Sequence, residues 1–325
     1  MTETFEFLGR GFRPEVQVQL QDAVARAVHT NNRLAVFDFD NTCISGDIGE
    51  LFAQYMIEGM YYSYDNTFWS LVDAQDGRDE IRELVERCRN PDHWGGVPFE
   101  AVPAETRLQD PSFRSYLSEM TVLYGRKLVR DGKSVCYPWS AQLHTGLSIA
   151  DLLQWSENAI ADELARDRAP SVFDDTSRGE RVEVIRGARI LGEVRTLMQD
   201  LRALDFDVWI VSASNRWTIE SFGKRFGVTA DRVIGNALEV DTNGVLGPAL
   251  IPPSLFRHGK VEAIARDIGT MPSLVFGDSV TDYEMMAQAT ELAVLIDSGD
   301  SFMLEEARRR GWAIQPQGEL TSLRH

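Results

Sequence analysis

The sequence predicts an open α/β fold with a parallel sheet that is interrupted by a long helical insert. Near both ends of the chain, short apolar runs that end in a polar residue alternate with amphipathic helical patterns. Residues 48 to about 183 contain helical patterns and loops rich in Pro and Gly, with no convincing strand. We therefore place the α/β core at residues 1–50 and 184–325, and a helical cap at residues 51–183.

The elements before and within the insert follow from periodicity. Residues 14–29 predict an amphipathic helix that opens on Pro14. The run RLAVFD at residues 33–38 predicts a buried parallel strand that ends in Asp38. In the insert, DIGELFAQYMIEGM and SIADLLQWSENAIADEL carry apolar residues three and four positions apart, as helices do.

After the insert, helices and strands alternate again. The patterns predict helices at 188–204, 214–226, 259–268 and 282–289, strands at 207–211 and 273–277, a last core strand at 292–296, and a hairpin over 233–249 that turns at Asn243-Gly244.

Composition excludes several classes of protein. The chain has 325 residues and a net charge of −17, and such a surface repels nucleic acids and anionic membranes. No stretch reaches the roughly 18 apolar residues of a membrane span, and the N-terminus lacks the pattern of a signal peptide. The three cysteines form no CxxC pair, which argues against a structural zinc site. We expect a cytoplasmic protein that binds neither nucleic acid nor membrane, and the sequence predicts no particular oligomeric state.

The segment Asp38-Phe39-Asp40-Asn41-Thr42 lies where the first strand should end. Side chains alternate along a strand, so Asp38 and Asp40 can share one face. Two carboxylates at such a short distance repel each other and favour a cation between them. Mg²⁺ prefers oxygen ligands. An Asp is also a nucleophile toward phosphorus and gives an aspartyl phosphate. The alternative is a pair of loop or capping aspartates.

Three further signals lie at or beside the ends of later strands. Ser212 follows the run DVWIV and can hold a phosphoryl oxygen or cap a helix. Lys260 opens a helix and can neutralise phosphate charge or stay solvated at the surface. Asp278 can complete the carboxylate set of a metal site, and Asp282 can orient Lys260 or a metal-bound water. The alternative for that segment is a capping box from Ser279 to Asp282.

The four signals together favour the functional interpretation. Open α/β sheets bind ligands at the carboxyl ends of their strands, and each signal is expected at that edge. Carboxylates, a hydroxyl, a lysine and further carboxylates supply a nucleophile, a metal site and charge neutralisation for phosphoryl transfer.

In this order the motifs resemble those of phosphatases of the haloacid dehalogenase (HAD) superfamily. The resemblance covers residues 33–50, 184–220 and 233–286. The hairpin before Lys260 and the segment VIRGAR look most like the phosphoserine phosphatase branch. The segment DNT, followed by Asp47 and Glu50, is also similar to phosphorylcholine phosphatase. The resemblance implies a Rossmann-like core with an inserted helical cap that closes over the cleft and sets specificity.

The resemblance also implies a Mg²⁺-dependent hydrolase that acts on a small phosphorylated metabolite through an aspartyl phosphate. Asp38 would attack phosphorus, while Asp40 would protonate the leaving oxygen and later take a proton from water. Mg²⁺ would be held by the Asp38 carboxylate, the Asp40 backbone carbonyl and Asp278. Ser212 and Lys260 would bind phosphoryl oxygens, and Thr42 and Asp282 would support these groups.

Two acidic residues just after the nucleophile bear on the substrate. In phosphoserine phosphatase a Glu at the position of Asp47 faces the substrate amine, and in phosphorylcholine phosphatase an acidic residue at the place of Glu50 faces the ammonium. Both favour a cationic or zwitterionic end, as in phosphoserine or phosphocholine. The alternative is a first helical turn whose acidic residues suit the helix dipole.

Aromatic residues are frequent in the insert and can cage an ammonium or simply pack the cap. They are Tyr61, Tyr62, Tyr64, Phe68, Trp69, Trp94, Tyr137, Trp139 and Trp155. Two other functions stay open: a phosphotransferase or mutase that uses the same aspartyl phosphate, and a non-catalytic module that binds a phosphorylated ligand.

Overall fold

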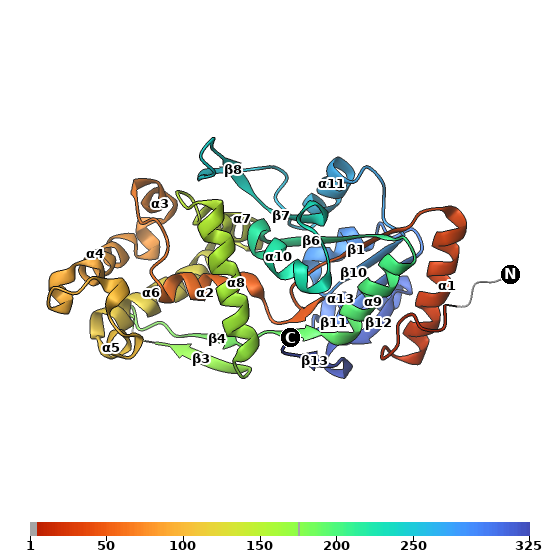
Figure 1. Cartoon of the computed structure of the whole chain (residues 1–325), viewed down its shortest axis with the longest axis horizontal. Helices are drawn as coiled ribbons and strands as arrows, with labels where there is room; N and C mark the ends of the chain where they lie inside the picture. The colour runs from red at the N-terminus through yellow and green to blue at the C-terminus, as the bar shows by residue number, and fades with distance from the viewer. Residues whose placement is uncertain (1–4, 175) are drawn as a thin grey trace.

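The computed structural model describes residues 5–174 and 176–325. One half of the elongated molecule is built on a parallel sheet of six strands in the order β12-β11-β10-β1-β6-β7 (Figure 1). The strands are β1 (Leu34–Phe37), β6 (Asp207–Asn215), β7 (Val233–Asn236), β10 (Leu274–Gly277), β11 (Leu292–Asp297) and β12 (Ala313–Pro316). The predicted α/β class with a parallel sheet is confirmed.

The central strand explains why the sheet forms here. Every residue of β1 is buried, because LAVF is apolar on both faces, as a parallel strand between two helical layers requires. Phe37 at the end of β1 lies opposite Phe276 of β10 and Ile210 of β6. The carboxyl ends of these three strands therefore lie at the same edge of the sheet. The sheet order places β6 and β7 on one side of β1, and β10, β11 and β12 on the other, so the connections at this edge lead in opposite directions.

Helices cover both faces of the sheet. One face packs against α1 (Pro14–Thr30), α9 (Gly192–Ala203) and α10 (Arg216–Gly223) in a core that includes Phe37, Ile210 and Phe276. The other face packs against α11 (His258–Asp267), α12 (Tyr283–Met286) and α13 (Ser301–Arg310) in a core that includes Val36 and Val275. Alternate residues of β1 thus enter different cores, as the period of a strand requires.

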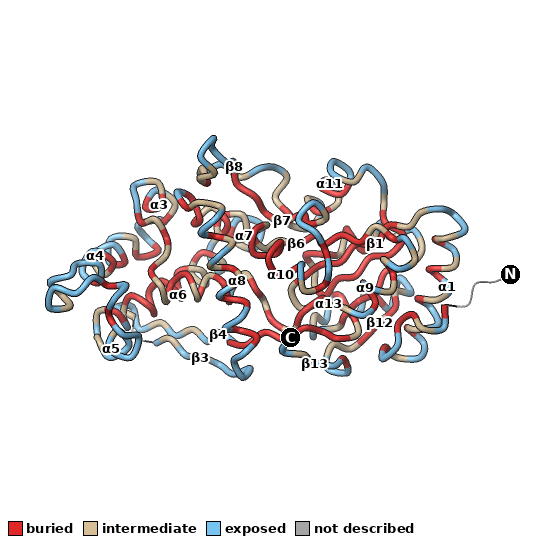
Figure 2. Tube along the Cα trace, in the orientation of Figure 1, coloured by how far each residue is buried: buried red, intermediate tan, exposed pale blue. Residues whose placement is uncertain are grey.

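The insert is largely helical and has an apolar cluster of its own, so buried segments occur in both halves of the elongated molecule (Figure 2). Its helices are α2 (Ile48–Glu58), α3 (Asn66–Leu71), α4 (Arg78–Arg89), α5 (Ala104–Gln109), α6 (Pro111–Asp131), α7 (Lys133–Gln142) and α8 (Ile149–Ala165). Trp217, Leu238 and Leu246 join the cluster of the insert from the other half of the chain. The division of the chain at residues 51 and 183 stays a prediction.

The prediction that residues 48–183 hold no strand is wrong. β3 (Ala169–Phe173) pairs antiparallel with β4 (Val182–Arg186), which lies across the predicted boundary. Exposed and half-buried residues alternate along both strands, so neither carries the apolar run by which a buried strand is found. A very short strand, β2 (Ile44–Ser45), also follows the loop that leaves β1.

Three predicted segments after the insert differ in the elements that they contain. The segment 188–204 begins as β5 (Arg189–Leu191), which pairs with β2 and β13 (Ser322–Leu323), before α9 starts. The hairpin consists of β8 (Leu238–Val240) and β9 (Leu246–Leu250), while β7 joins the main sheet. The segment 282–289 is helical only in its first part, as α12.

The strand predicted as the last of the core, β11, is followed by β12 at the sheet edge. Among the described residues, no helix combines the length and the apolar character needed to cross a bilayer.

Candidate active site

Asp38 is the first residue beyond β1 and lies at the carboxyl edge of the sheet. Its backbone N–H donates to the carbonyl of Phe276 at 2.9 Å, which fixes the residue between β1 and β10. The side chain is 5 % exposed and lines a cavity. Thr42 Oγ1 donates to Asp38 Oδ2 at 3.3 Å, so the start of the next loop folds back onto the carboxylate.

Lys260 lies in the first turn of α11, and its side chain is fully buried rather than solvated at the surface. Its Nζ donates to Asp38 Oδ1 and to Asp282 Oδ1, both at 2.6 Å. Burial opposes the positive charge, but the flanking Asp282 and Asp38 outweigh burial and raise the pKa of Lys260. The residue is therefore a protonated lysine that joins two separate motifs.

Asp282 and Asp278 have different surroundings in the site. Asp282 is fully buried, and its Oδ2 accepts the backbone N–H groups of Asp278 at 3.1 Å and Ser279 at 3.2 Å. The capping box from Ser279 to Asp282 is present, so Asp282 caps the turn and also holds Lys260. Asp278 faces the cavity and accepts Ser298 Oγ at 2.8 Å on its Oδ2.

The carboxylates of this edge fit a divalent cation. Oxygen atoms of Asp38, Asp278 and Asp282 lie within 4.8 Å of one another. Burial and repulsion from Asp282 raise the pKa of Asp38 to about 7 in spite of Lys260, because the single ammonium is shared. An oxygen-preferring cation such as Mg²⁺ would relieve this excess negative charge. Both Asp38 and Asp278 line the cavity, whereas both oxygens of Asp282 are already engaged.

Asp40 is held two residues further on, in the loop after β1. Its Oδ1 accepts the backbone N–H of Ile48 at 2.7 Å, and its Oδ2 accepts Ser214 Oγ at 2.6 Å. Burial, with added repulsion from Asp47 and Asp38, raises the pKa of Asp40 well above its ordinary value. A carboxyl group in that environment retains a proton at a pH where an exposed aspartate has lost it.

Ser212 and Ser214 share the end of β6, which continues past the predicted limit to Asn215. Ser212 is fully buried, and its Oγ accepts the backbone N–H of Ser214 at 3.1 Å. The helix cap considered for Ser212 is supplied instead by Asn215, which accepts from Trp217 and Thr218 at the start of α10. Ser214 is a further residue of the site that was not predicted. The only feature of the sequence that could indicate it is its position two residues after Ser212.

Asp47 and Glu50 lie beside the same cavity, at the start of α2. Asp47 caps the helix by accepting the Glu50 backbone N–H at 3.0 Å, so the capping alternative is realised while both side chains also line the cavity. Burial raises the pKa of Asp47, and repulsion from Asp47 together with burial raises that of Glu50 to about 7. Lys133, which also lines the cavity, acts in the opposite direction and favours a lower pKa of both carboxyl groups.

The cavity has a volume of about 510 Å³ and extends from the carboxylates into the insert. Of the aromatic residues singled out in the sequence, Tyr62, Tyr137 and Trp139 line it. The other six pack in or against the apolar cluster of the insert. Tyr124 and Lys133 also line the cavity, and neither carries a sequence signal that distinguishes it.

A family model described as haloacid dehalogenase-like hydrolase matches residues 120–287, just over half of the chain. The chain belongs to this family. The predicted HAD membership, and with it the expectation of a hydrolase, is confirmed. The matched range includes Ser212, Lys260, Asp278 and Asp282 but starts after Asp38 and Asp40.

Solved structures give the HAD hydrolase further relatives in fold. A conserved protein of unknown function from Anaerococcus prevotii DSM 20548 is 21 % identical, with 95 % of this chain and 94 % of that chain covered and a TM-score of 0.77. A protein of unknown function from Bordetella pertussis Tohama I is 15 % identical, with 88 % and 98 % covered and a TM-score of 0.54.

A phosphoserine phosphohydrolase-like protein from Francisella tularensis subsp. tularensis SCHU S4 is more distant, at 13 % identity, 88 % and 97 % coverage and a TM-score of 0.42. No curated protein matches the sequence significantly. The first two structures support the fold, and neither carries a functional description.

Proposed function

We propose that this HAD hydrolase is a Mg²⁺-dependent phosphatase that cleaves small phosphomonoesters through an aspartyl phosphate on Asp38. The observation that carries the proposal is the buried Lys260, which joins the carboxylates of Asp38 and Asp282 while Asp38 and Asp278 face one cavity. A buried lysine between two aspartates at a sheet edge suits a site where phosphate charge must be neutralised.

In the first half of the reaction, an oxygen of Asp38 forms a bond to phosphorus as the bond from phosphorus to the leaving oxygen breaks. Asp40 donates its proton to that leaving oxygen, a role that its raised pKa supports. Bound Mg²⁺, held by Asp38, Asp278 and the Asp40 carbonyl, would offset the charge on the phosphoryl oxygens. Lys260 adds a fixed positive charge beside them.

In the second half, the Asp40 carboxylate takes a proton from a water molecule as that water attacks phosphorus, which releases phosphate and restores Asp38. Ser212 uses its hydroxyl oxygen to accept the Ser214 N–H, so its hydroxyl hydrogen is available for a phosphoryl oxygen. Thr42 and Asp282 keep Asp38 and Lys260 in place.

The substrate that we propose has a cationic or zwitterionic end. Asp47 and Glu50 supply two carboxylates on the cavity wall, and the rings of Tyr124 and Tyr137 lie close enough for these carboxylates to affect the pKa of both phenols. Carboxylates beside aromatic faces are suited to an ammonium group. Lys133 offers a partner for a carboxylate, so both phosphocholine-like and phosphoserine-like compounds belong to the proposed class.

The proposal is tested by phosphate release from a panel of phosphomonoesters that includes phosphoserine and phosphocholine, with Mg²⁺ and with a chelator. We expect turnover only with the metal, and Asp38→Asn should reduce it to background. Asp205→Asn is the matched control, because Asp205 is exposed and its positive φ suits Asn. Rapid quench followed by mass spectrometry should find one added phosphoryl group on the peptide that contains Asp38.

The outcomes separate the alternatives. Full activity of Asp38→Asn would refute the mechanism. Phosphoryl groups recovered on a second substrate rather than as free phosphate would indicate a phosphotransferase or mutase. Binding of phosphorylated ligands without turnover would indicate a non-catalytic module.

A further inference from the structure

The cavity continues well past the residues that the proposed reaction uses. Asp47, the N-cap residue of α2, lines it together with Glu50 and Gln54 of the helix. These positions are three, four and seven residues apart, so they form one face of the helix. With a rise of 1.5 Å per residue, the lined face extends about 10 Å from Asp47 to Gln54. The cavity is therefore a channel that leads from the carboxylates into the insert.

The opposite wall is α6, and it contains a glycine that leaves space free. Met120, Thr121, Tyr124, Gly125 and Leu128 line the channel over two turns of this helix. A Cβ atom built on Gly125 would meet no atom within 4 Å. Glycine is unfavourable inside a helix relative to alanine, and packing against a neighbour does not require it here. The consequence of Gly125 that the structure shows is a wider channel.

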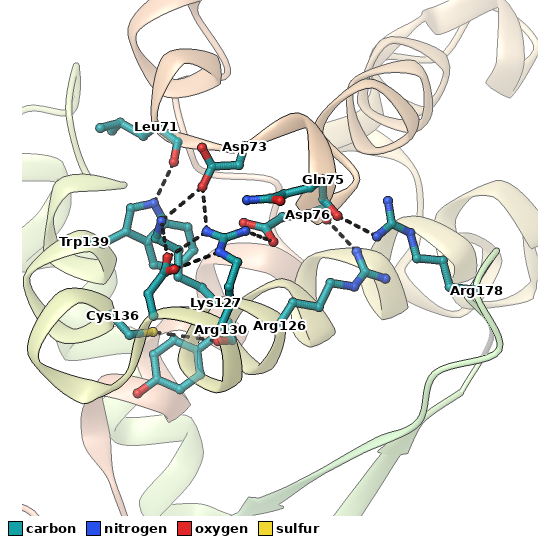
Figure 3. A network of polar contacts seen from close by, with 12 residues as sticks. Leu71, Asp73, Gln75, Asp76, Arg126, Lys127, Arg130, Cys136, Trp139 and Arg178 are labelled. Carbon is teal, nitrogen blue, oxygen red and sulfur yellow. Dashed lines mark hydrogen bonds and ion pairs between the residues drawn. The ribbon is translucent and has the colours of Figure 1, made fainter.

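Charged side chains of α6 tie this wall to a neighbouring segment. Arg126 donates to the carbonyl of Asp76, and Lys127 and Arg130 donate to Asp73 (Figure 3). Arg126 also pairs with the buried Glu119. These charged residues alternate with the lining residues along α6 and hold the helix against the segment that follows α3.

Apolar and polar side chains both line the channel. Ala53, Leu123, Trp139 and Leu143 contribute apolar surface. Tyr62, which is only 2 % exposed, also lines the channel. Two further lining residues are joined to each other, because Thr121 Oγ1 donates to Gln54 Oε1 at 3.0 Å. The apolar side chains of the channel suit an alkyl chain or a ring, in addition to the cationic group that Asp47 and Glu50 suit.

We infer that the channel binds the leaving alcohol of an elongated phosphomonoester, whose apolar chain or ring extends about 10 Å beyond the phosphate-binding edge. This inference rests on the proposed phosphatase activity and extends it, because phosphoserine and phosphocholine would leave the apolar part of the channel to water. Burial of that part of the substrate adds binding free energy in proportion to its apolar area.

The test is a homologous series of n-alkyl monophosphates, from ethyl to octyl, assayed with Mg²⁺ below their micelle concentrations. We expect kcat/KM to rise by roughly fourfold per added methylene until the chain fills the channel. Gly125→Leu should fill the channel and remove most of this rise, with Gly125→Ala intermediate. Val129→Leu is the matched control, because Val129 lies on the same helix and is 89 % exposed. It should leave the dependence on chain length unchanged.

Misfolding does not obscure this test, because both Gly125 variants replace a poor helix former with a good one. Circular dichroism and thermal unfolding should show a fold at least as stable as that of the parent. A flat or falling dependence on chain length in the parent enzyme would overturn the inference while leaving the phosphatase proposal intact. A rise that survives in Gly125→Leu would overturn it as well. Absence of turnover with every member of the series and of the phosphomonoester panel would instead refute the proposed function.

Discussion

Asp40 is held on both of its carboxylate oxygens, by the Ile48 N–H and by Ser214 Oγ at 2.6 Å. The backbone of Gly49 lies close to the Ser214 hydroxyl, because a Cβ atom on Gly49 would lie 2.8 Å from Ser214 Oγ. In the proposed mechanism, Ser214 therefore sets the direction in which Asp40 presents its proton. It would act in the step that protonates the leaving oxygen.

We predict that Ser214→Ala lowers kcat/KM for an alkyl phosphate by roughly tenfold, a fraction of what general acid catalysis contributes. The loss should be much smaller for p-nitrophenyl phosphate, whose leaving group needs no proton. Gly49→Ala should reproduce this selectivity by displacing the Ser214 hydroxyl. Equal losses for both substrates would show that Ser214 does not act through Asp40.

His144 provides a prediction about pH and stability. Burial lowers the pKa of this imidazole to about 4, although its Nδ1 has the Ala141 carbonyl as a hydrogen-bond partner. The unfolded chain takes up this proton below about pH 6.5, and the folded chain only below about pH 4, so stability falls as the pH drops between these values. This residue alone should cost about 2 kcal/mol by pH 5.

The measurement is urea unfolding at pH 7 and pH 5 for the parent protein and for His144→Gln. The variant should lose less stability on acidification, because other groups titrate equally in both proteins. Parallel pH dependences would contradict the assignment to His144.

At the scale of elements, a buried ion pair joins α8 to the chain that leaves β4. Glu163 Oε1 accepts Arg186 Nε at 2.8 Å, and its Oε2 accepts the Gly187 N–H at 2.7 Å. Arg186 also pairs with Glu58 at the end of α2. Two helices of the insert and the strand that leads back to the main sheet thus meet at one guanidinium.

We predict that Glu163→Ala lowers the free energy of unfolding by about 3 kcal/mol or more, because it leaves a buried arginine with one carboxylate fewer. Glu157→Ala on the same helix is the control. Its partners Lys224 and Arg225 are partly exposed, so its loss should cost about 1 kcal/mol or less. Equal effects in denaturant titrations would show that burial does not distinguish the two glutamates.

Most elements of the sheet could be predicted because strands buried on both faces leave apolar runs in the sequence. β1, β6, β10 and β11 are of this kind. β3 and β4 could not be found this way, because solvent reaches one of their faces. β5 has only three residues and runs directly into α9, so its apolar residues fit the helical period equally well.

The same distinction applies to the site. Asp38, Lys260 and Asp278 are connected to the ends of central strands or to a neighbouring helix, so their convergence follows from the topology of the sheet. Tyr124, Lys133 and Gly125 line the cavity only because α6 docks onto α2 and α7 docks onto α6 and β6. That docking depends on side-chain packing between distant segments, which local periodicity does not encode.

At the scale of the whole molecule, the insert and the sheet domain share their interior. Ser156 of α8 and Thr218 of α10 form a buried hydrogen bond of 3.0 Å, and the Gly146 N–H donates to the Leu246 carbonyl at 2.8 Å. Ile160 and Leu164 of α8 belong to the apolar cluster of the sheet domain. Elements that share buried surface in this way lose it together.

We therefore predict one cooperative unfolding transition for the chain. Tryptophan fluorescence, which reports largely on the insert, and loss of the proposed phosphatase activity, which reports on the sheet edge, should give coincident midpoints in urea. Two separated midpoints would show that the insert unfolds independently.

The position of β1 has a consequence for biosynthesis. Its hydrogen-bonded neighbours in the sheet are β6 and β10, which the ribosome makes only after the whole insert. At roughly 5–20 residues per second, synthesis of β6 follows that of β1 by on the order of ten seconds or more. Until then, the apolar strand β1 has no partner at either of its two hydrogen-bonding edges. During that interval the nascent chain presents a surface prone to aggregation. Demand for chaperones should therefore be greatest early in translation, and it should fall once β6 and then β10 have emerged.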